Sequence, residues 1–557
     1  MEQIKKEIDG ALFERLVLSG AGRLQSKVQE VNDLNVFPIP DGDTGENMFL
    51  TIKGGVDSMS NEKEYTLSAK AKALSNGMLL NARGNSGVIL SQLFFGLAEG
   101  LEGLETATIP EFEKALALGV KRAYSSVVKP VEGTILTVAR EAVEHTTDKV
   151  NENTDWLDFF RGFLDEMKKS LEHTPELLHT LKESGVIDSG GAGLVYIMEG
   201  FYKALKGEDY AGELAVTSTS NNASIDFSKF NENSVMEFGY CTELLLQLQS
   251  SKTDVENFSV DTIISFLETI GESIVAFKIG TVIKMHVHTM TPYKVLEFCQ
   301  QYGEYLSVKI ENMTLQHNES VKEDEDDGLN IKVKRARRKF AVVTVASGQG
   351  LIDVFKELGA DEVISGGQTN NPSSEDFIKA FDEVNADYVF VLPNNGNIVL
   401  TAKQAAEMYK DSDIRVIESK NIGQGYSALS MLDLTSDDPD AIQKQLSEDI
   451  KGVTTGMVSI AVRSTTVNGV QIEKDNYIGF TDHTMHVCEP TNTETACKLL
   501  EKLDIANKSF LILVCGIETS EEERAIVENY VSEVAPDVEV YTIDGGQDVY
   551  DFIMIVE

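Results

Sequence analysis

Along the first third of the chain, apolar residues recur every three or four positions, and no stretch shows the apolar–polar alternation of a strand. This spacing places apolar side chains on one face of an α-helix. The first segment shows it with Leu12, Leu16, Leu24 and Val31. We therefore predict an all-helical domain over residues 1–207, with further helices at 66–80, 86–101, 109–127, 133–150, 156–171 and 192–205.

After a linker rich in Ser, Thr and Asn at 215–222, the pattern changes to short strand-like and helical segments. Their order is β-α-β-β-α-β, which predicts a ferredoxin-like α+β domain over residues 208–330. The strands are expected at 234–249, 273–279, 281–288 and 307–311, and the helices at 261–270 and 292–302.

From residue 340 onward, apolar strands alternate with amphipathic helices. This alternation predicts an α/β domain over residues 340–557, with a parallel sheet formed by the strands between 340 and 418. The charged stretch at 319–339 is typical of a solvated linker. Strands are expected at 340–346, 362–365, 388–393, 414–418, 454–463 and 510–515, with helices at 350–358, 375–384 and 398–409.

Composition narrows the class of protein. The chain has 557 residues, too many for one hydrophobic core, and 42% hydrophobic residues, as in ordinary globular proteins. A formal net charge of −41 argues against nucleic acid or an anionic membrane as a partner. The five cysteines are scattered, the first residues lack the apolar core of a signal peptide, and no apolar run is long enough for a transmembrane helix. We expect a cytoplasmic protein without membrane insertion.

Candidate chemistry begins with the segment Pro40-Asp41-Gly42-Asp43-Thr44-Gly45, which leads directly into a helix. Asp41 and Asp43 flank a glycine, so both carboxylates can turn toward one point. Mg²⁺ is usually bound by one or two carboxylates together with phosphate oxygens, and the N–H groups of a helix start favour an anion at the same place. The alternative is a capped turn before a helix, since Asp and Thr are common capping residues.

Three other glycine-bearing segments precede helices in the same domain, at 81–87, 129–134 and 188–193. Small residues and free N–H groups at a helix start allow close approach of a phosphate. Together with the aspartate segment they predict the rim of a nucleotide site. Taken singly, Ser86 and Thr134 can equally be simple helix caps.

The middle domain carries a second candidate site. His286 and His288 alternate along one strand and therefore project to one face, and Cys241 lies on a strand expected to be its neighbour. With His317, which follows the last strand, they form a Zn²⁺-type ligand set. A packed cysteine beside an exposed His-Val-His edge, or a catalytic Cys–His pair, are the alternatives.

In the C-terminal domain, amide side chains are concentrated at 364–373 and 392–397, which follow predicted strands. Ligands of α/β sheets bind at the carboxyl ends of the strands. Gly348-Gln349-Gly350 is only a weak dinucleotide signal, because no complete glycine motif follows. No reaction is assigned to this domain, so we expect it to dock a partner.

The segments 40–48, 82–87 and 186–193 resemble the L-subunit domain of dihydroxyacetone kinases. The closer similarity is to the kinase subunit of bacterial fatty acid kinases, and it extends to the Cys241 and His286 segments and to both amide-rich segments. The resemblance implies an eight-helix barrel that holds ATP through Mg²⁺ ions in an aspartate cluster, and it supports Zn²⁺ in the middle domain.

The same resemblance implies roles for single residues. Asp41 and Asp43 would be the catalytic Mg²⁺ ligands. Where dihydroxyacetone kinases have a third aspartate this chain has Asn35, with Asp33 nearby, and Thr44 replaces a histidine. Nucleotide contacts are implied for Asn47, Ser86 and Gly87 at the phosphates, Thr134 near the nucleotide, and Asp188 at its base or ribose.

By resemblance, the chain would be a homodimeric kinase that transfers the γ-phosphoryl group of ATP to the carboxylate of a fatty acid. A separate fatty-acid-binding protein would present the acid, and acyl phosphate would be released. A fatty carboxylate is ionised at pH 7 and needs no general base, which agrees with the lack of a histidine in the aspartate segment. The alternatives are a nucleotide-sensing regulatory or adaptor protein, and a dihydroxyacetone-type kinase with another small substrate.

Overall fold

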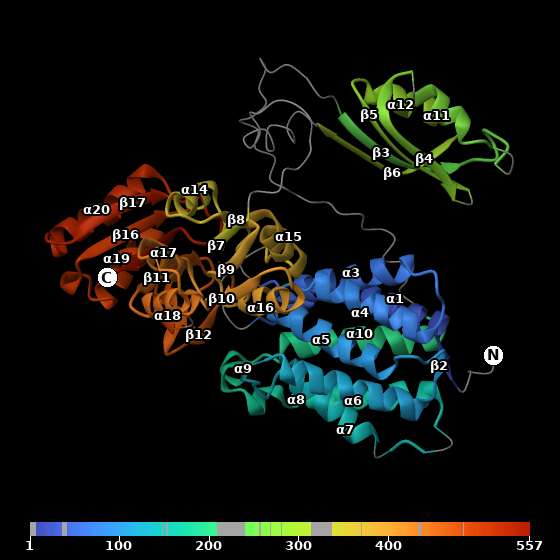
Figure 1. Cartoon of the computed structure of the whole chain (residues 1–557), viewed down its shortest axis with the longest axis horizontal. Coiled ribbons are helices and arrows are strands. Elements are labelled where there is room, and N and C mark those ends of the chain that lie inside the picture. The colour runs from blue at the N-terminus through green and yellow to red at the C-terminus, as the bar shows by residue number, and fades with distance from the viewer. Residues whose placement is uncertain are drawn as a thin grey trace. The chain divides into compact units, whose positions relative to one another are not determined.

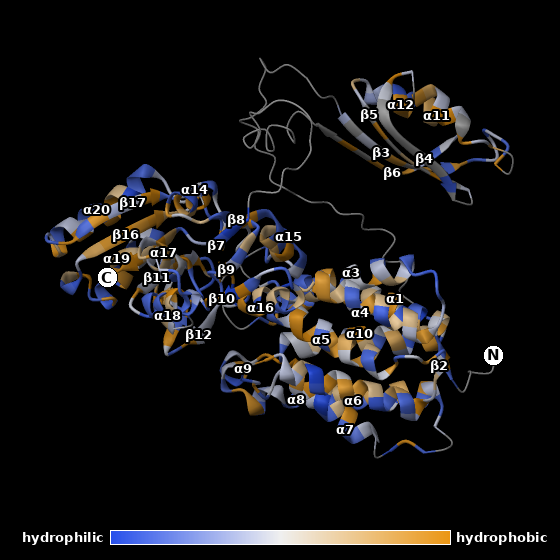
Figure 2. Ribbon diagram, viewed as in Figure 1, coloured by the Kyte–Doolittle hydropathy of each residue, from blue (hydrophilic) through white to orange (hydrophobic). Residues whose placement is uncertain are grey.

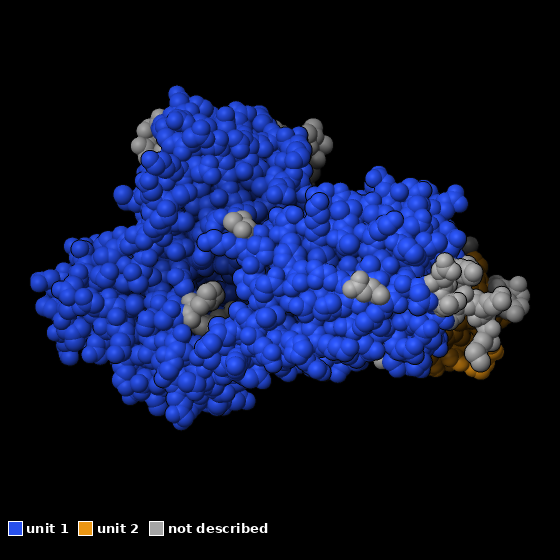
Figure 3. All heavy atoms as spheres, turned by 90° about the horizontal axis from the view of Figure 1, so that it is seen from below, with its two compact units in different colours: residues 1–218, 334–557 blue, residues 219–333 orange. Residues whose placement is uncertain are grey.

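A computed structural model describes residues 7–35, 42–127, 129–147, 149–151, 154–208, 240–255, 258–267, 269–279, 281–312, 337–368, 370–432, 436–482 and 484–557. The chain divides into two compact units, residues 1–218 with 334–557 and residues 219–333 (Figure 3). The first unit contains a helical domain and an α/β domain, and the second is a small α+β domain (Figure 1).

The N-terminal part is a bundle of helices, as predicted, with a two-residue ladder between β1 (Ile8–Asp9) and β2 (Thr106–Ala107). The core includes a cluster of rings in which Trp156 lies edge-on to Phe112 at 5.6 Å between centroids and stacks on Phe160 at 6.0 Å. None of the helices that the structure describes is long and apolar enough to cross a membrane. The helices are α1 (Gly10–Gln25), α2 (Val28–Asn32), α3 (Thr44–Asn61), α4 (Leu67–Leu80), α5 (Gly84–Gly100), α6 (Ile109–Ser125), α7 (Ile135–Thr147), α8 (Trp156–Leu177), α9 (His179–Ser184) and α10 (Ser189–Leu205).

The first sheet of the α/β domain is parallel, as predicted, with the strand order β10-β9-β7-β8. A helix follows each strand, and the helices after β7, β8 and β9 return the chain for the next parallel strand. The strands are β7 (Arg338–Ala346), β8 (Glu362–Ser365), β9 (Ala386–Leu392) and β10 (Asp413–Val416), and the helices are α14 (Gln349–Glu357), α15 (Ser374–Val384), α16 (Val399–Met408) and α17 (Ile422–Ser430).

A second sheet follows, mixed and largely antiparallel, in the order β15-β14-β11-β18-β16-β17. In β16 every residue after the first is buried, and Figure 2 shows this strand as predominantly apolar. Its strands are β11 (Thr454–Ile460), β14 (Tyr477–Thr481), β15 (Thr484–Glu489), β16 (Phe510–Cys515), β17 (Glu539–Asp544) and β18 (Phe552–Val556). Beside it lie α18 (Pro439–Asp449), α19 (Asn492–Lys502), α20 (Glu521–Val534) and the hairpin of β12 (Thr465–Val467) and β13 (Val470–Ile472).

The second unit has the predicted β-α-β-β-α-β order, and its antiparallel sheet has the strand order β4-β5-β3-β6. The first and third strands are central neighbours, as expected. Leu244, Leu246, Ile283 and Met285 form its core with the helices. The elements are β3 (Tyr240–Leu248), α11 (Asp261–Leu267), β4 (Gly271–Ile279), β5 (Val282–Thr289), α12 (Pro292–Cys299) and β6 (Gly303–Asn312).

Within the first unit, the helical and α/β domains are joined through α5 and α16. Gln404 on α16 is 5% exposed, and its amide nitrogen donates to the Leu79 carbonyl at 2.9 Å. Its amide oxygen accepts from Gln92 Nε2 at 3.0 Å and Ser91 Oγ at 3.3 Å. This fully bonded buried amide holds α16 against the end of α4 and the middle of α5.

Candidate nucleotide site

Asp43 occupies the N-cap position of α3, but its side chain makes no capping hydrogen bond. The Gly45 N–H of that helix instead donates to Asn32 Oδ1 at 2.7 Å. Because Asn32 satisfies the helix start, the Asp43 carboxylate remains available for a ligand. Asp41 lies outside the described residues, so its role stays a prediction.

The Asp43 side chain is partly buried and has no paired cation among the described residues. Asn371 Nδ2, from the α/β domain, donates to Asp43 Oδ2. Burial raises the pKa of Asp43 to about 7, while a hydrogen bond with Asn47 acts in the opposite direction. No lysine or arginine in the described part of the chain forms an ion pair with it. A carboxylate that is partly removed from water and has no paired cation favours binding of a cation, so the Asp43 oxygens fit Mg²⁺.

A cavity of about 670 Å³ opens beside Asp43, between the helical and α/β domains. This volume lies within the range of about 300–1,000 Å³ that is typical of small-molecule sites. One wall contains Asn35, Asp43, Thr44, Asn47, Asn85 and Ser86 from the helical domain. Polar residues of the opposite wall are Gln368, Asn395, Asn397, Lys420, Asn421 and Asp482.

Asn35 rather than Asp33 lies at this cavity. Asn35 Oδ1 accepts hydrogen bonds from Thr44 Oγ1 at 2.8 Å and from Ser189 Oγ at 3.3 Å, which links the starts of α3 and α10. Asp33 is exposed. From the α/β domain, Arg463 donates to the backbone carbonyls of Asp33 and Asn35, so both domains hold the segment before the aspartates.

The start of α5 faces the start of α3. Gly84 has a φ of 56°, and a Cβ there would lie 2.6 Å from Asn47 Nδ2, so glycine is required on both counts. Ser86 lies in the first turn of α5 and lines the cavity, and it is not the N-cap, which is Arg83. A Cβ on Gly87 would lie 2.4 Å from Thr51 Oγ1, so close packing of α5 on α3 explains this glycine.

Asp188 caps α10 by accepting from Gly191 N–H at 2.7 Å. Burial raises its pKa to about 6, opposed by backbone hydrogen bonds from Gly191 and Ile135. The bond to Ile135 brings the start of α7 to the start of α10. The starts of α3, α5, α7 and α10 are therefore connected at one end of the bundle, as the glycine-bearing segments predicted.

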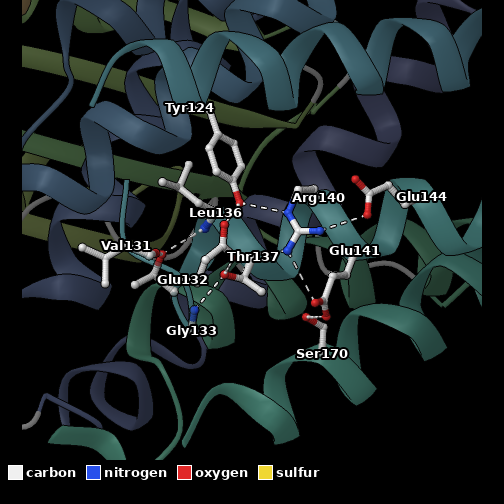
Figure 4. Close-up of polar contacts among 11 residues, drawn as sticks. Tyr124, Val131, Glu132, Gly133, Leu136, Thr137, Arg140, Glu141, Glu144 and Ser170 are labelled. Atoms are coloured by element: carbon white, nitrogen blue, oxygen red, sulfur yellow. Dashed lines mark hydrogen bonds and ion pairs between the residues drawn. The ribbon is translucent and has the colours of Figure 1, made fainter. Parts of the chain in front are cut away.

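Thr134 belongs to the turn before α7 and does not line the cavity. Its hydroxyl donates to the Val131 carbonyl at 2.8 Å. The same turn is held by Glu132, which accepts from Thr137 Oγ1 at 2.6 Å and from Arg140 Nη2 at 3.1 Å (Figure 4). Within the described residues the Thr134 hydroxyl thus serves its own turn, and its contact with nucleotide stays a prediction.

Sequence reasoning missed that the α/β domain forms half of the cavity. It singled out the two amide-rich segments at the carboxyl ends of β8 and β9 but assigned them to partner docking. Which domain faces another cannot be read from local spacing. Lys420, which follows β10, was recognisable by the same rule for strand ends.

In the middle domain, the backbone register pairs Cys241 with His288 and Glu243 with His286. Paired positions lie on the same face of a sheet, in agreement with the predicted neighbourhood. The side chains of Cys241, His286 and His288, and the whole of His317, lie outside what the structure describes. The described residues contain no group of three or more His, Cys, Asp and Glu that could hold a metal, so the Zn²⁺ site stays a prediction.

Three family models match the chain in succession. They are the DAK2 domain at residues 38–203, the middle domain of FakA-like fatty acid kinase proteins at 237–320, and the C-terminal region of the same FakA-like proteins at 341–557. The matches follow the order of the helical, α+β and α/β domains.

Relatives match over the full length. An uncharacterized protein of Staphylococcus saprophyticus is 37% identical over 99% of this chain and 100% of its own length. Another, from Staphylococcus aureus strain USA300, is 36% identical with the same coverage.

Likeness to solved structures is weak. DegV, a fatty acid binding protein from Bacillus subtilis, aligns over 39% of this chain and 99% of its own with 15% identity and a TM-score of 0.30. The dihydroxyacetone kinase from C. freundii in complex with AMP-PNP and Mg²⁺ aligns over 37% of this chain and 36% of its own, with 18% identity and a TM-score of 0.29. The family models and the full-length relatives show that the chain belongs to the FakA-like family of fatty acid kinase proteins, with a DAK2 domain in its N-terminal part.

Proposed function

We propose that this chain is a kinase subunit that transfers the γ-phosphoryl group of ATP to the carboxylate of a fatty acid. A separate fatty-acid-binding protein holds the acid, and the product is an acyl phosphate. One observation carries the proposal: in the DAK2 domain, Asp43 presents a partly buried carboxylate, which has no cation partner among the described residues, to a cavity of about 670 Å³ at the joined helix starts. Family membership supplies the reaction class.

The residues at the cavity have distinct parts in this reaction. Asp41 and Asp43 would hold Mg²⁺, and the ion would supply neutralisation of the charge on the transferring phosphoryl group. Asn35 orients Thr44 beside the aspartates through the bond between their side chains. Asn47 and Ser86 line the cavity and offer polar groups to the phosphates, and the backbone of Gly87 in the first turn of α5 is the third proposed phosphate contact. We propose that Thr134 lies near the nucleotide and that Asp188 lies at its base or ribose.

No histidine is among the residues that line the cavity in the described part of the chain. This suits a carboxylate acceptor, which attacks in its ionised form. A nucleotide-sensing adaptor and a dihydroxyacetone-type kinase for another small substrate are the competing functions. Turnover of ATP only with fatty acid and its binding protein present distinguishes the kinase from both.

We also propose three domains for the chain. The helical domain, residues 1–207, is an eight-helix barrel, the α+β domain, 208–330, is ferredoxin-like, and the α/β domain covers residues 340–557. The proposal includes a cytoplasmic homodimer, with the α/β domain as the surface that docks the fatty-acid-binding protein.

The test is Asp43→Asn in the full chain, with acyl phosphate measured from ATP, oleate and the binding protein. Outer-shell partners of metal ligands cost about 10- to 100-fold when lost, so losing a ligand should reduce the rate by about a hundredfold or more. Glu46→Gln is the matched control, because Glu46 is an exposed carboxylate in the first turn of the same helix. Wild-type rates in Asp43→Asn would remove this site from the proposal.

We also propose that Cys241, His286, His288 and His317 hold Zn²⁺ in the middle domain. The backbone register, which pairs Cys241 with His288, supports this ligand set. Purified chain prepared without chelator should contain about one zinc per chain, lost in His286→Ala. Metal analysis that finds no zinc in the wild type contradicts the site.

A further inference from the structure

The α/β domain reaches the aspartate site through a short segment before α15. Ser373 forms an isolated antiparallel bridge with Arg83, and Ser374 N–H donates to the Ala82 carbonyl at 3.3 Å. The Arg83 guanidinium donates to the backbone carbonyl of Asn371 at 2.6 Å. The segment is therefore joined to the turn that opens α5, directly beside the cavity.

The same segment is fixed on its own side by the start of α15. Ser373 and Asp376 form a capping box, in which the Ser373 N–H and hydroxyl both donate to Asp376 Oδ2 at 2.8 Å. Asp376 Oδ2 also lies 3.9 Å from Arg83 Nη2. Asn371 is thus held between two anchored helix starts.

The side chain of Asn371 is 2% exposed and points at the candidate metal ligand. Its nitrogen donates to Asp43 Oδ2, while its oxygen is buried and has no hydrogen-bond partner in the described part of the chain. A buried polar atom without a partner costs about 1–3 kcal/mol. Such an atom in a native structure calls for a reason, and a bound ion is one.

We propose that Asn371 is a positioning residue for Asp43. Its amide nitrogen fixes the carboxylate in the orientation that would receive Mg²⁺, and its buried oxygen, without a partner among the described residues, marks the amide as held for this contact. The inference rests on the proposed function, because it takes Asp43 as a metal ligand. It makes the α/β domain a direct part of the metal–phosphate site as well as a docking surface.

The first test is calorimetric titration of ATP into the full chain, once with Mg²⁺ and once with EDTA. Asn371→Leu should weaken ATP binding about 10- to 100-fold in Mg²⁺, as for other outer-shell partners of metal ligands, and leave binding in EDTA unchanged. A purely structural role would weaken both. Asn370→Leu is the matched control, because Asn370 is exposed and one residue away. Equal binding of Mg²⁺ and ATP by Asn371→Leu and wild type overturns the inference.

A second variant keeps the test independent of folding losses. Asn371→Asp retains the size of the side chain but sets a second carboxylate against Asp43, and a divalent cation relieves this repulsion. The rise in Tm on adding Mg²⁺ should therefore be larger than in the wild type. An equal rise overturns the inference alone. A wild-type chain with no Mg²⁺ effect on ATP binding or Tm overturns the proposed function together with it.

Discussion

Two partly buried aspartates, Asp43 and Asp188, lie at the end of the helical bundle where the helix starts meet, and their hydrogen bonds differ. Burial raises the pKa of both, to about 7 for Asp43 and about 6 for Asp188. The Asp188 carboxylate caps α10 through Gly191 N–H, whereas Asp43 makes no capping bond. A carboxylate already bonded to backbone N–H groups has less to offer a cation, so Asp43 is the one of the two that we propose as a metal ligand.

Lys420 supplies positive charge from the other wall of the cavity. It is exposed, lines the cavity, and forms no ion pair within the described residues, while its neighbour Glu418 is paired with Lys403 at 2.5 Å. Lys420→Met should weaken ATP binding about tenfold, or about 1.4 kcal/mol, as for loss of one hydrogen bond to a charged group. Calorimetric titration with ATP and ADP measures this.

The comparison of nucleotides separates a specific contact from a general charge effect. If Lys420 contacts the terminal phosphate, Lys420→Met loses more affinity for ATP than for ADP. The matched control is Lys451→Met, because Lys451 is exposed in the same domain and does not line the cavity. Equal losses for both nucleotides, or an equal effect of the control, contradict the role of Lys420.

At the scale of elements, the spacing of apolar residues is sufficient to predict a helix or strand wherever that element buries one face. The helix predicted at 109–127 is α6, and the strand at 388–393 is β9. The helix predicted to start at 192 starts at Ser189, directly after its N-cap Asp188. The glycines of this first turn lie within the helix and allow close packing, since a Cβ on Gly191 would lie 2.9 Å from Val138 Cγ2. A glycine-rich segment indicates that another group approaches the backbone closely. It does not distinguish a turn before a helix from a contact between two helices.

The strand pairing of the second sheet and the cavity between the two domains could not be predicted from local sequence patterns. β11 and β18 pair although nearly a hundred residues separate them, and nothing in either strand specifies that partner. The Asn371–Asp43 bond joins residues 328 positions apart. The position of Asp43 at the cavity thus agrees with a prediction from local spacing, but the α/β wall could not be predicted, because it depends on how two domains dock.

At the scale of the molecule, a substitution of Gln404 tests how the helical and α/β domains dock. Gln404→Leu removes the donor to the Leu79 carbonyl and the acceptor of Gln92 Nε2, leaving both without a partner in the interface. The free energy of unfolding should fall by about 1–3 kcal/mol, measured by urea denaturation. Gln349→Leu is the control, because Gln349 is exposed at the start of α14 and its amide donates to Asp353 of the same helix.

Nucleotide affinity in the same variant decides whether docking completes the site. Gln404 does not line the cavity, so its loss cannot remove a contact with ATP. If the α/β domain holds Asp43 in place through Asn371, loosening the α5–α16 interface should also weaken binding of ATP with Mg²⁺, in proportion to the fraction of chains that are undocked. Unchanged affinity in a clearly destabilised Gln404→Leu chain would mean that the helical domain binds ATP by itself, with the α/β domain only adjoining it.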